Sequence, residues 1–201
     1  MGHVLGIIGD MRLRSFLVAL FLGALSGCSG QSSIRPVEAL DAKTGITWAA
    51  LREPIELEQS AQSAVVTLGK HTSLIYFGPV EWDRSGNIGY GLWINVAPGS
   101  GAQVGDIREP GAVSLILDDG PLVLTTIDAP KLGREAYRLV VSWGQVAYFQ
   151  LSAGTLRRIA GSQRLELDFR AGDGAVLRFT PGRDAHARLS AFVRGRNIIG
   201  D

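Results

Sequence analysis

The 201-residue sequence contains one cysteine and three histidines, and its charges nearly cancel, with 20 Lys and Arg against 19 Asp and Glu. A single cysteine excludes an internal disulfide framework and any metal cluster built on several cysteines. The net charge of +1 argues against a general nucleic-acid-binding protein, because such proteins carry a large basic excess that neutralises phosphates. With 46% hydrophobic and 19% charged residues, the chain does not have the composition of a disordered protein.

Several signatures of catalysis are also missing. The sequence has no Gly-x-Ser-x-Gly element for a serine nucleophile and no phosphate-binding glycine loop, although it contains 26 glycines. His71 and His186 are the only histidines after the N-terminal region, and neither belongs to a ligand-spaced cluster. The sequence therefore predicts no catalytic residue, no metal site and no cofactor.

The longest apolar run, residues 15–25, is too short for an ordinary membrane-spanning helix, which needs about 20 residues. Arg12 and Arg14 precede this run, and the small residues Ser26 and Gly27 follow it. A basic start, a short apolar core and small residues before a cleavage site are typical of a secretory signal peptide.

The signal ends in Leu25-Ser26-Gly27-Cys28, which resembles the lipobox of bacterial lipoproteins. This resemblance implies that signal peptidase II cuts before Cys28 and that the cysteine carries diacylglycerol and palmitate-type acyl chains. Because each buried methylene contributes about 0.8 kcal/mol, several acyl chains would hold the protein on the membrane. Residue 29 is Ser rather than Asp, which in Gram-negative lipoproteins implies transport to the outer membrane, here with the domain on the periplasmic face.

Three segments are expected along the chain. Residues 1–27 form the signal peptide, and we expect Met11 to be the true start. Residues 28–44 are polar and are expected to form a flexible, lipidated tether. Residues 45–201 are expected to form a single β-rich globular domain.

The fold class predicted for this domain is α+β and β-rich, an antiparallel sheet or sandwich of hairpins with two short C-terminal helices. We expect strands within residues 46–48, 55–58, 65–68, 72–77, 80–84, 88–96, 112–117, 122–127, 137–142, 145–149, 164–169 and 175–179. Pro79 is expected to end a strand, because proline cannot donate to a central ladder. One helix should be capped by Ser152, and the other should begin at Thr180 and Pro181.

The strand expected at 88–96 has two different faces. Alternation places Tyr90 and Leu92 on one face, and Gly89, Gly91 and Trp93 on the other. Two glycines on one face allow a bulky group to lie close to the backbone.

The candidate partner-binding residues are aromatic or basic. Trp82 and Trp93 would contribute to a sugar- or peptide-binding platform if exposed, whereas burial would make them core residues. Residues 28–150 carry a formal charge of −4, and residues 151–201 carry +4 with nine arginines, including Arg157 and Arg158. These arginines either form a face that binds anions or are a solvated surface that neutralises the acidic half.

Three functions remain open from the sequence. The first is a non-catalytic, lipid-anchored module that binds an envelope protein or a cell-wall partner. The second is a hydrolase of envelope glycans that uses carboxylates near Trp82, of which Glu81 and Asp83 are the closest in sequence. Asp118 and Asp119 are also acidic, but their place in a predicted turn accounts for them without a catalytic role. The third is a carrier of a small apolar ligand.

Overall fold

Eleven strands form one antiparallel sheet in the part of the chain that the computed structural model describes, residues 34–60, 74–97, 105–128, 135–139 and 142–198. The strands are β1 (Pro36–Asp41), β2 (Ile46–Leu51), β3 (Ile55–Gln59), β4 (Leu74–Arg84), β5 (Asn87–Ala97), β6 (Val113–Leu117), β7 (Gly120–Val123), β8 (Thr126–Ile127), β9 (Gln145–Leu151), β10 (Glu166–Arg170) and β11 (Val176–Pro181). Their order is β7-β6-β10-β11-β3-β4-β5-β9-β8, and β2 also pairs with β4 and carries β1. The predicted β-rich α+β class is confirmed, as a single sheet rather than a sandwich.

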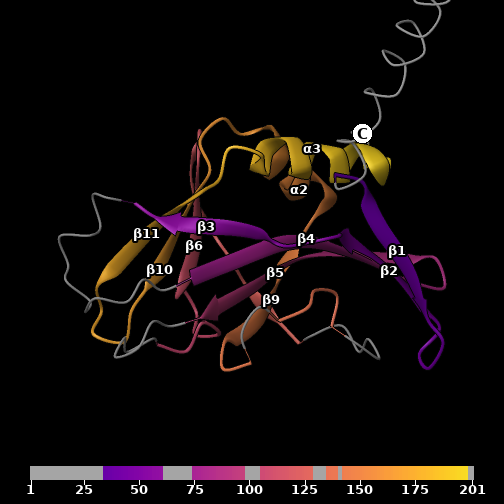
Figure 1. The fold of residues 1–201 in the computed structure, drawn as a ribbon, viewed down its shortest axis with the longest axis horizontal. Coiled ribbons are helices and arrows are strands. Elements are labelled where there is room, and N and C mark those ends of the chain that lie inside the picture. The colour runs from indigo at the N-terminus through magenta and orange to yellow at the C-terminus, as the bar shows by residue number, and fades with distance from the viewer. Residues whose placement is uncertain (1–33, 61–73, 98–104, 129–134, 140–141, 199–201) are drawn as a thin grey trace, which may run out of the picture. The chain divides into compact units, whose positions relative to one another are not determined.

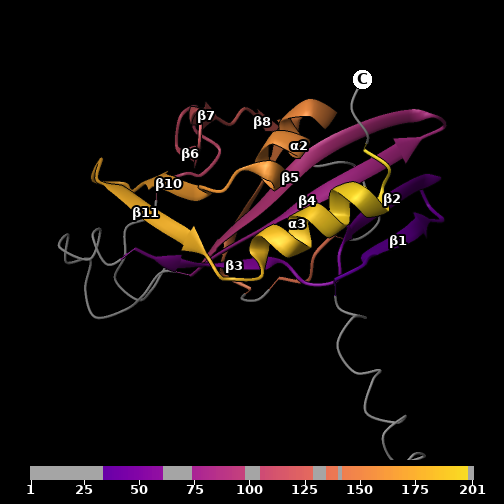
Figure 2. The same cartoon turned by 90° about the horizontal axis from the view of Figure 1, so that it is seen from above.

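Two helices lie on one side of this sheet, α2 (Ala153–Gly161) and α3 (Ala185–Gly195), and they pack against each other (Figures 1 and 2). The Ser152 hydroxyl accepts a hydrogen bond from the Thr155 amide at 2.9 Å, so the predicted cap of the first helix is confirmed. The second helix begins later than predicted, because Thr180 and Pro181 complete β11 and Asp184 precedes the helix.

The apolar core follows the strand register. Ile55, Phe77, Ile94 and Ala147 form one row across β3, β4, β5 and β9, and each is at most 4% exposed. Alternation along β4 places Glu81 on the same face of the sheet as Phe77. Arg196, at the end of α3, donates a hydrogen bond to Glu81. The two helices therefore cover this face of the sheet.

Strand β4 continues through Gly78 and Pro79, so the prediction that Pro79 ends a strand is wrong. The neighbouring strand is interrupted at this point, between the end of β2 at Leu51 and the start of β3. The Tyr137 hydroxyl occupies the gap: it accepts from the Leu51 amide at 3.1 Å and donates to the Pro79 carbonyl at 2.7 Å. Proline is tolerated because its missing N–H faces an interruption rather than a continuous ladder.

The Tyr137 contact also corrects a second prediction. Tyr137 was expected to begin a strand over 137–142, but it lies in a bend, and none of the described residues of that segment is in a strand. Its ring lies over Gly78, where an added Cβ would approach the Tyr137 hydroxyl to 2.3 Å. Glycine is required at that position because the ring occupies the space of a side chain.

The boundary of the predicted tether is also corrected. The folded unit begins at Ile34, and residues 36–41, assigned to the tether, form the edge strand β1. The Asp41 carboxylate accepts hydrogen bonds from the Lys43 amide and the Thr44 hydroxyl, which shapes the turn into β2. The predicted strand at 65–68 lies outside the described residues.

Candidate functional site

The candidate residue Trp93 lies in the core and not on a binding surface. It is fully buried on β5 opposite Gly78, and its ring centroid lies 5.0 Å from that of Tyr137. Its indole N–H has no hydrogen-bond partner among the described residues. The prediction of a partner-binding role for Trp93 is therefore wrong, and the alternative of core packing is correct.

Trp82 is half-buried and explains the paired glycines of β5. A Cβ at Gly89 would lie 2.3 Å from the indole nitrogen of Trp82, and one at Gly91 would lie 2.9 Å from its six-membered ring. The bulky group expected over the glycines is thus a side chain of the same protein. One edge of Trp82 borders a surface pocket of about 360 Å³ that is also lined by Tyr90 and Ile127.

The arginines predicted to bind a partner have different environments on α2. Arg158 is exposed and forms an ion pair with Asp119 at 2.6 Å, across the boundary between the acidic and basic halves of the sequence. Arg157 is half-buried. The structure therefore does not bring Arg158 and Arg157 together with Trp93 into one exposed patch.

The carboxylates near Trp82 are both occupied by structural contacts. Glu81 is 4% exposed, and its Oε1 accepts from Nε and Nη2 of Arg196 at 3.0 and 2.6 Å. Arg196 also bonds Glu38 on β1, so one guanidinium joins the end of α3 to two strands. Asp83 accepts from the Gly86 amide at 2.7 Å in the β4–β5 turn. Glu81 is therefore not an exposed carboxylate, as a hydrolase that used it would require.

The register of the β4–β5 hairpin contains the signal that sequence reasoning missed. Glu81 pairs with Tyr90, whose strand face also carries the buried residues Leu92 and Ile94. A carboxylate aligned with that apolar face must be buried, and a buried carboxylate requires a cationic partner. The identity of the partner, Arg196, depends on the tertiary fold.

Asp118 and Asp119 form the predicted turn between β6 and β7, which ends at Gly120 with a φ of 119°. The Asp118 carboxylate accepts from the amides of Gln163 and Arg164, both at 2.7 Å. These two backbone hydrogen bonds hold the pKa of Asp118 below its usual value. Asp118 therefore connects the turn to the segment that follows α2.

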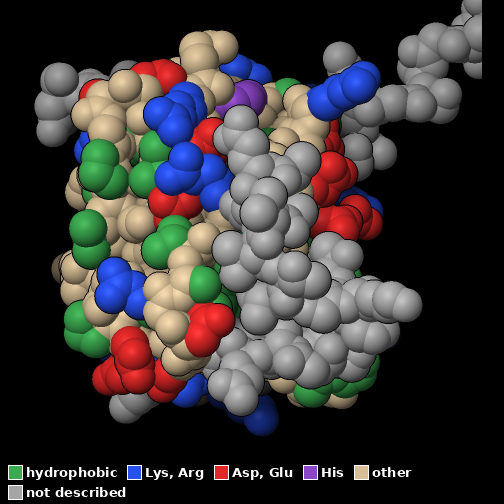
Figure 3. All heavy atoms as spheres, turned by 90° about the vertical axis from the view of Figure 1, so that its left-hand side faces the viewer, with side chains coloured by type: hydrophobic (Ala, Val, Ile, Leu, Met, Phe, Trp, Pro, Cys, Tyr) green, Lys and Arg blue, Asp and Glu red, His purple; other side chains and the backbone are tan. Residues whose placement is uncertain are grey.

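The opposite charges of the two sequence halves are mixed in space. Arg158 bonds Asp119, and Arg196 bonds Glu81 and Glu38, so arginines of the C-terminal half pair with acids of the other half. Within the C-terminal half, Arg178 bonds Asp168 through two nitrogens at 2.7 and 2.8 Å. Figure 3 shows basic and acidic side chains interspersed on the face at the left of Figure 1. Most of the described C-terminal arginines thus serve local ion pairs, and the sequence halves do not form one acidic and one basic face.

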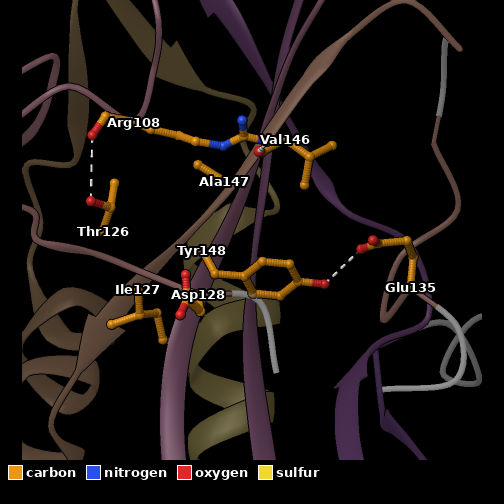
Figure 4. Close-up of a pocket in the computed structure, with 8 residues that line it drawn as sticks. All are labelled: Arg108, Thr126, Ile127, Asp128, Glu135, Val146, Ala147 and Tyr148. Carbon is orange, nitrogen blue, oxygen red and sulfur yellow. Dashed lines mark hydrogen bonds between the residues drawn. The ribbon is translucent and has the colours of Figure 1, made fainter. Parts of the chain in front are cut away.

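A polar pocket of about 470 Å³ lies against β8 and β9 (Figure 4). The Tyr148 hydroxyl donates to Glu135 at 2.7 Å on one side, and Arg108 donates to the Val146 carbonyl at 3.0 Å on the other. The Thr126 hydroxyl bonds the Arg108 carbonyl at 3.4 Å. Tyr148, Arg108 and Thr126 therefore each make one hydrogen bond within the protein at this pocket.

Burial raises the pKa of Tyr148, and the adjacent Glu135 carboxylate raises it further. The phenol is therefore neutral at physiological pH and acts as a hydrogen-bond donor. A neutral phenol held by a carboxylate does not supply the pair of separated carboxyl groups that glycoside hydrolysis uses.

The predicted anchor residues, Leu25, Ser26, Gly27 and Cys28, lie outside the described residues. Within the described ranges, no helix has the length and apolar character needed to cross a membrane. The same residues contain no group of three or more His, Cys, Asp or Glu side chains arranged to hold a metal ion.

In comparisons with family models, curated proteins and solved structures, nothing matches the chain.

Proposed function

We propose that the protein is a lipoprotein of the bacterial envelope, anchored through acylated Cys28, and that its domain is a non-catalytic binding or structural module. One observation carries the proposal. The only cysteine of the chain follows an apolar run and the residues Leu25-Ser26-Gly27, and the folded unit begins six residues later, at Ile34. This arrangement joins a complete lipidation signal to a folded domain through a short polar spacer.

The contacts of the carboxylates support the non-catalytic part of the proposal. A glycan hydrolase would need one carboxyl group as a proton donor and a second as a nucleophile or base, both open to the substrate. Glu81 is buried against Arg196, and Asp83 is held in a hairpin turn. Neither group is available for the chemistry that the alternative hydrolase function requires.

The packing of the described core argues against the carrier function. A carrier of a small apolar ligand needs an apolar cavity, whereas the helix-covered face is filled by large side chains such as Phe77, Phe149, Phe179 and Phe192. The pocket beside Tyr148 is instead lined by charged groups, Arg108, Asp128 and Glu135, together with apolar residues such as Ile127.

The anchor is tested by Cys28→Ala, with Ser29→Ala as the matched control, in a Gram-negative host supplied with a clickable palmitate analogue. We expect the control to incorporate the analogue and to fractionate with the outer membrane. Cys28→Ala should not incorporate the analogue, should keep its signal peptide and should not reach the outer membrane. Normal processing and outer-membrane fractionation of Cys28→Ala would refute the proposal.

The predicted destination has its own test in Ser29→Asp. If residue 29 determines sorting, this variant should incorporate the palmitate analogue like the wild type but fractionate with the inner membrane. An unchanged outer-membrane location would refute that part of the proposal. A partner is sought separately, by crosslinking of the wild-type protein in cells.

A further inference from the structure

A pocket of about 460 Å³ lies between β3 and the chain that leads from β11 into α3. Strand β11 pairs with β3 only over residues 57–59, and after Pro181 the chain turns away to begin α3 (Figure 2). The pocket has the size of sites that take small ligands, which range from about 300 to 1,000 Å³. It therefore has room for a small ligand.

The charged residues that line this pocket are mostly acidic. They are Glu53, Glu56, Glu58, Asp184 and Arg188. Arg188 donates to the backbone carbonyl of Glu53 and lies 3.8 Å from the Asp184 carboxylate, so its positive charge offsets that of Asp184. The exposed Arg52 and Arg183 adjoin lining residues in the sequence, but neither of them lines the pocket. In the described ranges none of the three glutamates forms an ion pair, so the lining carries an excess of negative charge.

Tyr76 adds a polar group without a partner to the same pocket. It lines the pocket from β4, and its side chain is buried, with only 9% of the residue exposed. Its hydroxyl makes no hydrogen bond within the described residues, and unlike the indole nitrogen of Trp93 it is not sealed from solvent. Because buried polar side chains are normally hydrogen-bonded, this hydroxyl is placed to bond a molecule that enters the pocket.

The strand register places the acceptors of the pocket close to one another. Glu56 pairs with Tyr76 across β3 and β4, and directly opposite side chains lie about 5 Å apart at their Cβ atoms. Burial raises the pKa of Tyr76, and the negative charge of Glu56 raises it further, so the phenol is neutral at physiological pH. Glu58 lies two positions further along β3, on the same face and about 7 Å from Glu56.

We propose that this pocket binds an organic cation that carries two ammonium groups. The Arg188 donors are engaged within the protein, so the ligand must supply both the N–H donors and the positive charge. One ammonium group fits between Glu56 and Tyr76, and a second, about 7 Å away, fits at Glu58, a spacing that a linear diamine provides. Among the described residues these carboxylates do not converge as metal ligands would. The inference rests on the proposed binding function and gives it a ligand class.

The test is isothermal titration calorimetry of the full lipidated protein in detergent micelles at low salt. The probe is diaminobutane, which carries two ammonium groups, and the matched comparison is butylamine, which has the same alkyl chain and one ammonium group. We expect saturable binding of diaminobutane at one site per chain and binding of butylamine that is weaker by about threefold or more. Added salt should weaken the binding of both, because the carboxylates are exposed.

Three variants assign the binding to this pocket. The double variant Glu56→Gln and Glu58→Gln should weaken diaminobutane binding about tenfold, as the product of about threefold for each exposed carboxylate. Tyr76→Phe should weaken it about three- to tenfold, because it removes only the hydroxyl that accepts from the ammonium group. The matched control, Glu109→Gln with Asp128→Asn, replaces two exposed acids outside the pocket and should bind like the wild type.

A blocked peptide with two lysines, titrated in parallel, distinguishes the two sources of such a cation. Tighter binding of the peptide than of diaminobutane indicates a basic segment of a partner, and weaker binding indicates a free diamine.

The proposal is overturned if diaminobutane shows no saturable binding, or if butylamine or calcium ions bind as tightly as diaminobutane. It is also overturned if the glutamate double variant or Tyr76→Phe keeps the wild-type affinity. The lipid anchor is tested separately, by palmitate incorporation at Cys28. A calorimetric failure in a protein that incorporates palmitate therefore refutes the ligand class of the pocket and leaves the anchor in place.

Discussion

Replacing Tyr137 with Phe removes a hydroxyl that two buried backbone groups share. In the structure this hydroxyl accepts from the Leu51 amide at 3.1 Å and donates to the Pro79 carbonyl at 2.7 Å. The phenylalanine ring would still lie over Gly78, so the strands could not close the gap to form a direct hydrogen bond. Leaving a buried polar group without a partner costs about 1–3 kcal/mol, so losing both partners should destabilise the fold by about 2–4 kcal/mol.

The assay for Tyr137→Phe is urea unfolding followed by tryptophan fluorescence. With an m value of about 2 kcal/mol/M, the midpoint should fall by about 1–2 M. Tyr76→Phe is the matched control, because Tyr76 is also a mostly buried tyrosine but its hydroxyl bonds no other described residue. A midpoint for Tyr137→Phe that equals that of Tyr76→Phe would refute the proposed role of the hydroxyl.

Alkaline pH gives a second test of the same residue. Burial raises the pKa of Tyr137 above its ordinary value of 10.0, so the phenol keeps its proton in the folded state while the unfolded state loses it. Stability should therefore be unaffected below pH 10 and should fall above it, by up to about 1.4 kcal/mol per pH unit for each such tyrosine. Tyr137→Phe should show a shallower decline, and an unchanged slope between pH 10 and 11 would contradict the assignment.

Three further substitutions test other contacts. Gly89→Ala should displace Trp82, whose indole nitrogen lies 2.3 Å from the added Cβ, with a loss of about 1–3 kcal/mol and a red-shifted tryptophan emission; an unchanged spectrum would contradict the packing. Gly154→Ala, in α2 and free of close contacts, should instead stabilise the protein by about 0.5–1 kcal/mol in thermal unfolding. Arg196→Ala leaves Glu81 buried without its cation and should cost about 3 kcal/mol in urea, largely recovered in a double variant that also replaces Glu81 with Leu; absence of recovery would indicate that Arg196 acts through other contacts.

Local signals in the sequence predicted the hairpin of β4 and β5 and the first helix. Ser85 and Gly86 both adopt positive φ, at 54° and 88°, as a tight two-residue hairpin turn requires. Ser152 likewise caps α2 through a contact only three residues away. Such features depend on neighbouring residues, so the sequence alone is sufficient to locate them.

The contacts that sequence reasoning missed join distant parts of the chain. The Tyr137 hydroxyl bonds Pro79 and Leu51, which lie 58 and 86 positions away in the sequence. Arg196 bonds Glu81, which lies 115 positions away. Pro79 lies in a central strand, although proline is normally excluded there because it cannot donate a hydrogen bond to the neighbouring strand. The fold accommodates it because the hydroxyl of the distant Tyr137 occupies the gap in that neighbouring strand. Similarly, β1 pairs only with β2 and is partly exposed, so its short sequence carried no clear strand signal beside the polar residues before it.

The candidate site illustrates the same limit. The sequence indicated that two glycines on β5 would allow close approach of a bulky group, and that expectation is confirmed by Trp82. Whether Trp82 and Trp93 are exposed is decided by how the whole chain packs, which local sequence signals do not show. The anchor prediction is different, because cleavage and acylation are read from a short linear segment and need no tertiary contact.

The most direct test of the account is the intact mass of the protein purified from the outer membrane of a Gram-negative host. The account predicts a chain whose first residue is Cys28, with the added mass of a diacylglycerol group and an N-terminal acyl chain. A mass that retains residues 15–27, or a chain that contains Cys28 without lipid, would contradict it.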